Sequence, residues 1–569
     1  MSQFPTSGRV AGGAVSKASD LWSTLLCVAI LLVCVLVSHP VAEAGMGDDF
    51  AYIWSAKVLA ETGHVVYVGW AAMMLAWQLY LGALFIKLFG FSFTVVRASV
   101  TLVSLMSTAI LHRILIRMGL GEWNASVATL SIVLSPLVLS LTTTFMSDVP
   151  GMIAVLVCLY CCVRAIQTQS ERATIAWLVA AAVSNDVLGM VRQISWLGAL
   201  VLVPSAAWCL RGRRGVPVTG LVLWLVSLGF VGGCLHWLGQ QPYMAHEELF
   251  YSYHRGQLAQ VWVLTLAAIL LATPLLSVFA LPSGTLRSAG RSWTLFAGAL
   301  AGCGIVLLDH GRSFDRVSSL IVPYAAAVPL MVKLTLTGVS FGCLFCFAAE
   351  LRGAISNFTA GASSAIPTGT GAVPARIWMV LLGPFTCAYM FLVVTRDAVW
   401  PRYLVTALPM LVLLLLWVYR WNAPQRRLPV VSAVVVGVFA ILAVANTHDM
   451  FADLSARIAA VNNIMSAGVP RTAIEGGFGL DGWEQLELTG HVNDSRVTLP
   501  VGAYQPRKPS GTPPECHNWF FDWTPSIQPR FEISSSPSSC FPPASFAPVH
   551  YRAWYPPHDR AIYIAAVPD

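Results

Sequence analysis

Three aspartates stand where membrane-length apolar segments end. Asp48 and Asp49 lie in the stretch GMGDDFAY (residues 45–52), which follows the first long apolar run, and Asp148 lies in FMSDVPG, beyond a later run. Adjacent carboxylates repel each other and gain nothing from lipid. Asp148 could simply cap the N-terminus of a helix, a structural role that requires no catalytic function. Carboxylates beside a membrane cavity are nonetheless candidates for proton transfer or ion coupling.

Basic residues recur in the segments that we place on the same side of the membrane as these acids. Such cations suit an anionic ligand at the membrane surface. Pairing with neighbouring acids would explain them equally well, and both interpretations stay open. The outer cations are Lys57, Lys87, Arg97, Arg192, Arg255, Arg312, Arg316, Arg396 and Arg402.

The composition of the chain points to a helical membrane protein. Its 569 residues are 56% hydrophobic and 11% charged, with a mean hydropathy of +0.69, whereas soluble domains carry about 25% charged residues. Apolar runs of about 18 or more residues recur along most of the chain, without the alternation of an outer-membrane barrel. We therefore predict an all-α polytopic fold.

About thirteen spans are predicted when the N-terminus is placed in the cytoplasm. A cleaved signal peptide competes for the first run, but the run has full length and a long polar region precedes it. The majority of Lys and Arg then falls inside, so we interpret the net charge of +7 as a topology signal and expect no nucleic-acid binding. The predicted spans are 21–40, 93–116, 124–144, 150–168, 173–190, 194–210, 216–238, 260–281, 292–308, 321–350, 377–395, 403–419 and 428–446.

These spans form a predicted membrane domain over residues 1–446. Its first outer loop, 41–92, contains two stretches that we interpret as helices lying along the membrane interface. A polar tail, 447–569, forms an extracytoplasmic domain, either α/β or mostly irregular. Cys516 and Cys540 are the only cysteines in the tail and predict a disulfide bond. The aromatic cluster CHNWFFDWTP (516–525) either stacks on sugar rings or forms a small core and membrane-facing rim.

The order of these features resembles the GT-C superfamily of membrane glycosyltransferases over residues 40–450. The most similar branch includes lipid A aminoarabinose transferases and protein O-mannosyltransferases. In LFGFSFTVVRASV, Gly90 and Arg97 stand where that branch has its FG…R, and LSLTTTFMSDVPG and PRYLVTALP resemble its second acidic and late motifs. Met74 stands where the aminoarabinose branch has a lysine expected to touch the donor phosphate, which speaks against aminoarabinose transfer.

The resemblance implies transfer of a sugar from a polyprenyl-phosphate donor to a hydroxyl of a glycan, lipid or protein. Asp48 would be the general base, Asp49 would orient it or raise its pKa, and Asp148 would orient the acceptor. The resemblance implies no certain cofactor, and a divalent cation on Asp48 and Asp148 stays open. The donor phosphate would be bound by cations and a tyrosine drawn from Arg97, Lys87, Arg402, Tyr403, Arg192 and Arg255.

The resemblance places the enzyme in a bacterial inner membrane, with its active site and tail on the periplasmic face. In-line displacement would invert the anomeric carbon. The competing hypothesis is a transporter or lipid-linked-sugar flippase, in which membrane-embedded acids couple ion movement. Two observations count against it: the halves of the chain show no internal repeat, and the acids cluster at one face.

Overall fold

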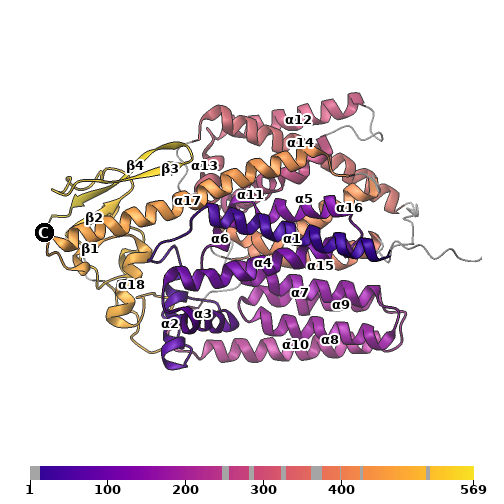
Figure 1. Ribbon diagram of the computed structural model, residues 1–569, viewed down its shortest axis with the longest axis horizontal. Coiled ribbons are helices and arrows are strands. Elements are labelled where there is room, and N and C mark those ends of the chain that lie inside the picture. Colours follow the sequence, from indigo (N-terminus) through magenta and orange to yellow (C-terminus); the bar gives the residue numbers. More distant parts are fainter. Residues whose placement is uncertain are drawn as a thin grey trace, which may run out of the picture.

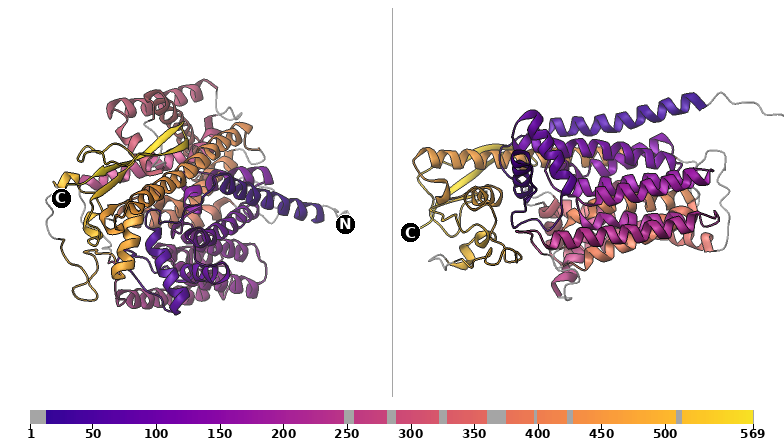
Figure 2. Two further views of the ribbon diagram at one scale, coloured as in Figure 1. Left: turned by 60° about the vertical axis from the view of Figure 1, so that its left-hand side comes forward. Right: turned by 90° about the horizontal axis from the view of Figure 1, so that it is seen from below.

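Long helices lie side by side in the protein, and a small mixed sheet stands at one end of this bundle (Figure 1). The computed structural model describes residues 13–246, 255–280, 288–321, 328–359, 375–396, 399–422, 427–507 and 513–568. Figure 2 shows the N-terminal helix along one side of the bundle and the C-terminal domain beyond its end.

Ten helices in the described parts of the chain are long and apolar enough to cross a membrane, or up to eleven when a bent pair counts as one span. The bent pair is α5 (Glu122–Val133) and α6 (Pro136–Thr142), which meet at 70°. The ten lie in α1 (Gly13–Val37), α4 (Phe93–Arg117), α7 (Asp148–Gln167), α10 (Val216–Gly239), α11 (Arg255–Ala280), α12 (Ser288–Leu308), α14 (Leu330–Thr359), α15 (Ala375–Val394), η4 (Pro401–Tyr403) with α16 (Leu404–Asn422), and α17 (Val430–Ser466).

The predicted number of about thirteen spans is therefore too high when spans are counted by helix length and apolar composition. The two predicted spans without a counterpart are 173–190 and 194–210. The first segment forms α8 (Glu171–Gly189), whose polar residues lower its hydropathy. The second is broken into η1 (Gln193–Trp196), η2 (Gly198–Leu202) and α9 (Val203–Cys209). The buried Asn185 amide bonds the carbonyls of Ala154 and Ser195 and the backbone N–H of Ala199, so one polar side chain satisfies the irregular backbone.

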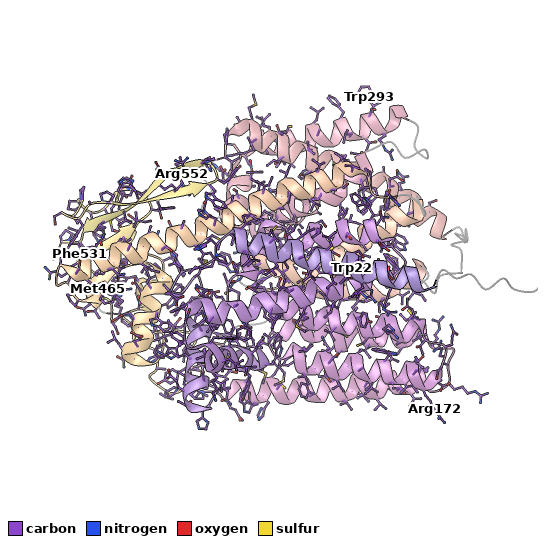
Figure 3. All side chains as sticks on the ribbon, in the orientation of Figure 1. Trp22, Arg172, Trp293, Met465, Phe531 and Arg552 are labelled. Carbon is purple, nitrogen blue, oxygen red and sulfur yellow. A yellow bond between two sulfur atoms is a disulfide. The ribbon has the colours of Figure 1, made fainter. Side chains whose placement is uncertain are left out.

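The surface of the bundle matches a lipid environment. Trp22 on α1 and Trp293 on α12 are about 70% exposed and point outward (Figure 3). Arg172, predicted on the cytoplasmic side, lies at the end of the bundle opposite the sheet (Figure 3). Arg172 and the sheet therefore lie at opposite ends of the bundle.

Both helices predicted in the outer loop are present, as α2 (Asp49–Thr62) and α3 (Ala76–Phe89). They pack on each other at the end of the bundle that carries the sheet, and α2 also contacts α18 (Phe478–Thr489) (Figure 1). The short helix α13 (Arg312–Ile321) packs against α11.

The C-terminal domain is built on α17, which continues for 37 residues through the predicted boundary at 446/447. Its sheet has the order β1-β2-β4-β3. Strands β1 (Ile474–Glu475) and β2 (Phe531–Ser534) are parallel, whereas β4 (Pro557–Ala566) pairs antiparallel with β2 and with β3 (Val549–Trp554). A disulfide bond joins Cys516 to Cys540, as the sequence predicted. The short helices η5 (Arg471–Ala473), η6 (Pro514–Cys516) and η7 (Phe521–Trp523) complete the domain.

Candidate active site

The two adjacent aspartates point to different partners. Gly47, with φ +59°, turns the chain just before them. Asp49 is fully buried and accepts hydrogen bonds from the backbone N–H of Met46 at 2.7 Å and from Arg97 Nε at 2.8 Å. Asp48 is the N-cap residue of α2 but makes no capping bond. Its carboxylate instead pairs with Arg402 Nη1 at 2.6 Å.

Arg97 fixes the loop that carries Asp48. Besides Asp49, its guanidinium donates to the carbonyl oxygens of Ala42 at 2.9 Å and Ala44 at 2.5 Å. All three of its nitrogens therefore donate to protein groups, and its side chain is 2% exposed. This geometry favours a positioning role for Arg97 over the phosphate contact expected from the sequence.

Asp148 forms a second buried pair, with Arg192. Asp148 begins α7, and its Oδ1 accepts a hydrogen bond from Arg192 Nη1, which comes from the segment between α8 and η1. A Cβ on Gly151 would lie 3.3 Å from Arg192 Cδ and 2.9 Å from Ser195 Oγ, so the glycine lets this arginine approach α7. Among the described residues, Asp148 Oδ2 has no hydrogen-bond partner although it is buried.

Both pairs converge on Tyr403, in the short helix η4. The guanidinium carbons of Arg192, Arg396 and Arg402 lie 5.0, 5.3 and 5.9 Å from the centroid of its ring. The Tyr389 hydroxyl donates to the Tyr403 carbonyl at 2.7 Å. We call this group, with Asp48 and Asp148, the Tyr403 cluster. It contains three guanidinium groups and two carboxylates, an excess that suits an anionic ligand.

The charges of both Asp–Arg pairs act on the phenol of Tyr52, in α2. It is 1% exposed, and burial raises the pKa of its phenol well above the usual value. The charge of Asp48 raises this pKa further, Asp148 does so to a smaller extent, and Arg402 and Arg192 oppose them. The phenol is therefore neutral beside both carboxylates.

The other predicted cations are not brought into this cluster by the described contacts. Lys87 is exposed near the end of α3. Arg255 begins α11, which packs against η4, but its side chain lies outside the described residues. Sequence reasoning counted Arg396 only as one outer cation and did not single out Tyr52 or Tyr389. Arg396 had a usable signal, since it follows the apolar run of α15 at the outer end.

The residues of the cluster do not fit a divalent cation. Among the described residues, no group of three or more His, Cys, Asp or Glu side chains is placed to hold a metal. Asp48 and Asp148 each pair with an arginine, and a cation between them would have to displace that partner. The chemistry below therefore uses protein groups alone.

A comparison with protein-family models defines the class of protein. Residues 71–228 match the model of the dolichyl-phosphate-mannose-protein mannosyltransferase family. This confirms the resemblance to GT-C enzymes drawn from the sequence over the matched segment, and the protein is a membrane glycosyltransferase. The matched segment contains Arg97, Asp148 and Arg192, whereas Asp48 and Tyr403 lie outside it.

The comparison with curated proteins finds no match. Among solved structures, apo ArnT from Cupriavidus metallidurans has 13% identity and a TM-score of 0.40, covering 97% of this chain and 100% of that one. ArnT bound to undecaprenyl phosphate has 14% identity and a TM-score of 0.34, covering 96% and 99%. The Archaeoglobus fulgidus oligosaccharyltransferase in complex with Zn and sulfate has 13% identity and a TM-score of 0.43. The match covers 88% of this chain and 62% of that one. These TM-scores are low, so the class rests on the family match.

Proposed function

We propose that the protein transfers a sugar from a polyprenyl-phosphate donor to an acceptor hydroxyl, with the chemistry at the Tyr403 cluster. The single observation that carries this proposal is the convergence of two Asp–Arg pairs on one tyrosine. Asp48, Asp148, Arg192 and Arg402 come from four separate segments of the chain. Such a convergence of buried charges at one end of a membrane bundle is expensive and needs a functional reason.

Asp48 is the general base in this proposal, because its side chain is 16% exposed whereas Asp148 and Asp49 are 2% and 0% exposed. An acceptor arriving from the aqueous side reaches Asp48 first. Asp148 orients the acceptor through its second oxygen, which has no hydrogen-bond partner among the described residues. A positioned carboxylate of this kind contributes roughly 10²–10⁴ in rate.

Arg402 contacts the donor phosphate. Its Nε is buried and has no hydrogen-bond partner among the described residues, so it has a donor available for a phosphate oxygen. Arg192 and Arg396 add positive charge around the same ring. Lys87 and Arg255 stay secondary candidates, and Arg97 acts by holding the loop of Asp48.

The bond changes then follow. The acceptor oxygen attacks the anomeric carbon while Asp48 takes its proton, and the bond from that carbon to the lipid phosphate oxygen breaks. The electron pair leaves with the phosphate, whose charge the arginines stabilise. Attack opposite the leaving group inverts the anomeric carbon. The setting we propose is modification of an envelope glycan or glycolipid at the periplasmic face of a bacterial inner membrane.

The transporter or flippase alternative has no observation in its favour here. Asp48 caps α2, which lies at the end of the bundle that carries the C-terminal domain (Figure 1), and Arg192 and Arg402 meet at the Tyr403 ring. The family match is to a glycosyltransferase. A coupling site would be expected near the middle of the spans.

The decisive experiment replaces Asp48 by Asn in the full-length protein and follows lipid-linked sugars and envelope glycans by mass spectrometry. We expect loss of the glycan product with retained binding of undecaprenyl phosphate as a donor probe. Asp559→Asn, at a 70% exposed side chain, is the control and should leave the product unchanged. Full transfer by Asp48→Asn would contradict the role of Asp48.

A further inference from the structure

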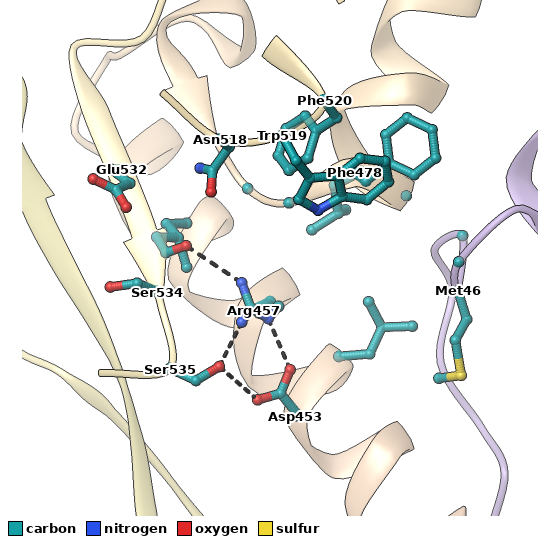
Figure 4. Close-up of a pocket in the computed structure, with 18 residues that line it drawn as sticks. Met46, Asp453, Arg457, Phe478, Asn518, Trp519, Phe520, Glu532, Ser534 and Ser535 are labelled. Atoms are coloured by element: carbon teal, nitrogen blue, oxygen red, sulfur yellow. Dashed lines mark hydrogen bonds and ion pairs between the residues drawn. The ribbon is translucent and has the colours of Figure 1, made fainter. Parts of the chain in front are cut away.

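A pocket of about 360 Å³ lies where the acidic loop meets the C-terminal domain (Figure 4). Its walls are residues 45–47, residues 453, 454 and 457 of α17, and residues 476–480, 518–520 and 532–535. We call it the junction pocket. Its volume falls in the range of small-ligand sites, roughly 300–1,000 Å³.

The junction pocket is continuous with the catalytic loop. Gly47 lines it, and Asp48 is the next residue. The opposite wall meets this loop backbone to backbone, since a Cβ on Gly479 would lie 2.1 Å from the carbonyl oxygen of Gly45. A molecule in the pocket therefore lies beside the loop that presents the proposed base.

One side of the pocket is an exposed aromatic surface held in place by other rings. Trp519 is 66% exposed, yet its ring centroid lies 4.9 Å from that of Phe478 and 5.2 Å from that of Trp523. The Cys516–Cys540 disulfide joins the segment that carries Trp519 to the chain following β2, so it connects two walls of the pocket. A fixed, exposed indole offers a flat apolar face on which the C–H face of a sugar ring can stack.

The polar side of the pocket is unsuited to a phosphate. Among the described residues, Arg457 is the only cation in its lining. It donates to Asp453 at 2.7 Å, to Ser535 Oγ at 2.5 Å and to the Ile533 carbonyl at 3.3 Å (Figure 4). The facing wall presents the Glu532 carboxylate and the Asn518 amide, and these groups accept hydrogen bonds from hydroxyls. This lining contrasts with the cation-rich Tyr403 cluster, where the donor phosphate is proposed to bind.

We propose that the junction pocket binds a neutral sugar residue of the acceptor, so that the acceptor is a glycan. A sugar ring stacks on Trp519, its hydroxyls donate to Glu532, and the chain of the glycan leads past Gly47 toward Asp48. This inference rests on the proposed function, since it names the acceptor class for that site. Free glycans and the glycan part of a glycolipid share this chemistry.

The test measures binding to full-length protein in lipid nanodiscs by saturation-transfer NMR. The probes are neutral oligosaccharides released from the cell envelope, the same glycans still attached to lipid, and a Ser/Thr-rich peptide set. We expect Trp519→Ala to weaken glycan binding about tenfold, the size of one lost aromatic contact with its buried area. Trp519→Phe should retain most of the binding, and the matched control Trp554→Ala, outside the pocket, should retain all of it.

The outcomes separate this inference from the proposed function. Binding of lipid-free glycans identifies a polysaccharide acceptor, and binding of the lipid-attached form alone identifies a glycolipid; both support the pocket if Trp519→Ala weakens them. Glycan binding that is absent, or equal in Trp519→Ala, overturns the inference, as does binding of the peptides alone. The Asp48→Asn variant should bind glycans normally, so loss of the catalytic assignment would leave this measurement intact.

Discussion

Asp48 and Asp49 are neighbours in the chain, yet their arginine pairs differ in almost every physical respect. The Asp49–Arg97 pair is closed: both side chains are at most 2% exposed, and the carboxylate and guanidinium also bond the backbone of residues 42–46. The Asp48–Arg402 pair is open, with side chains 16% and 25% exposed and with Arg402 Nε unpartnered among the described residues.

This difference separates a pair that stabilises structure from one that is available to a ligand. A buried ion pair is favourable only when its remaining donors and acceptors are satisfied, and the closed pair meets that condition. The open pair leaves hydrogen-bonding groups without partners, which costs stability. A bound phosphate and a bound hydroxyl would offset that cost.

The largest expected effect is on turnover in Asp48→Asn. We expect kcat to fall about a thousandfold, because a general base contributes roughly 10²–10⁴ in rate. The thermal unfolding midpoint should stay within the range of a surface substitution, since the open pair is partly solvated. The measurement is turnover of a purified donor lipid alongside a thermal unfolding scan in the same detergent.

The closed pair should show the opposite behaviour in Arg97→Met. Removing the guanidinium leaves Asp49 charged and buried, which costs about 3–5 kcal/mol of folding free energy. Thermal unfolding should report a large drop in midpoint, and the matched change Arg402→Met should give a much smaller one. Equal drops for the two variants would show that the open and closed pairs do not differ in the way described.

Much of this arrangement could be predicted from the sequence. The length of the apolar runs predicted the helical membrane fold, and the two helices predicted in the first outer loop are present as α2 and α3. The only two cysteines of the tail predicted the disulfide bond. These features depend on local composition and length, which a sequence displays directly.

The partners of the aspartates could not be predicted, because they depend on long-range packing. Arg402 follows Asp48 by 354 positions, and Arg97 follows Asp49 by 48. In the sequence, both arginines were predicted as outer cations and as candidates for binding the donor phosphate. Only the path of the loop around Gly45 and Gly47 decides which one closes on the buried acid and which one stays open.

A smaller effect is expected when the geometry of the open pair changes and its charge does not. In Arg402→Lys, the ammonium retains the charge but loses the Nε donor and the planar fork of the guanidinium. We expect KM for the donor lipid to rise about tenfold, which is the loss of one charge-assisted hydrogen bond, while kcat changes little. A change in KM for the acceptor alone would mean that Arg402 does not face the phosphate.

The smallest effect concerns a third kind of buried carboxylate, Glu475, which forms no ion pair with an arginine among the described residues, although the charge of Arg507 partly offsets the rise in its pKa. Burial, together with Asp481 and Glu532, raises the pKa of Glu475 from 4.5 to about 8, and its Oε1 has no hydrogen-bond partner among the described residues. Between these two pKa values the folded chain holds a proton that the unfolded chain has lost, so stability contributed by this group falls as pH rises from about 4.5 to 8. Glu475→Gln should flatten that decline in thermal unfolding of the full-length protein.

Asp559→Asn should not change the pH dependence, since that carboxylate is exposed in both states. If the slope of stability against pH is unchanged in Glu475→Gln, the Glu475 carboxyl does not retain a proton in the folded domain, and this prediction is wrong.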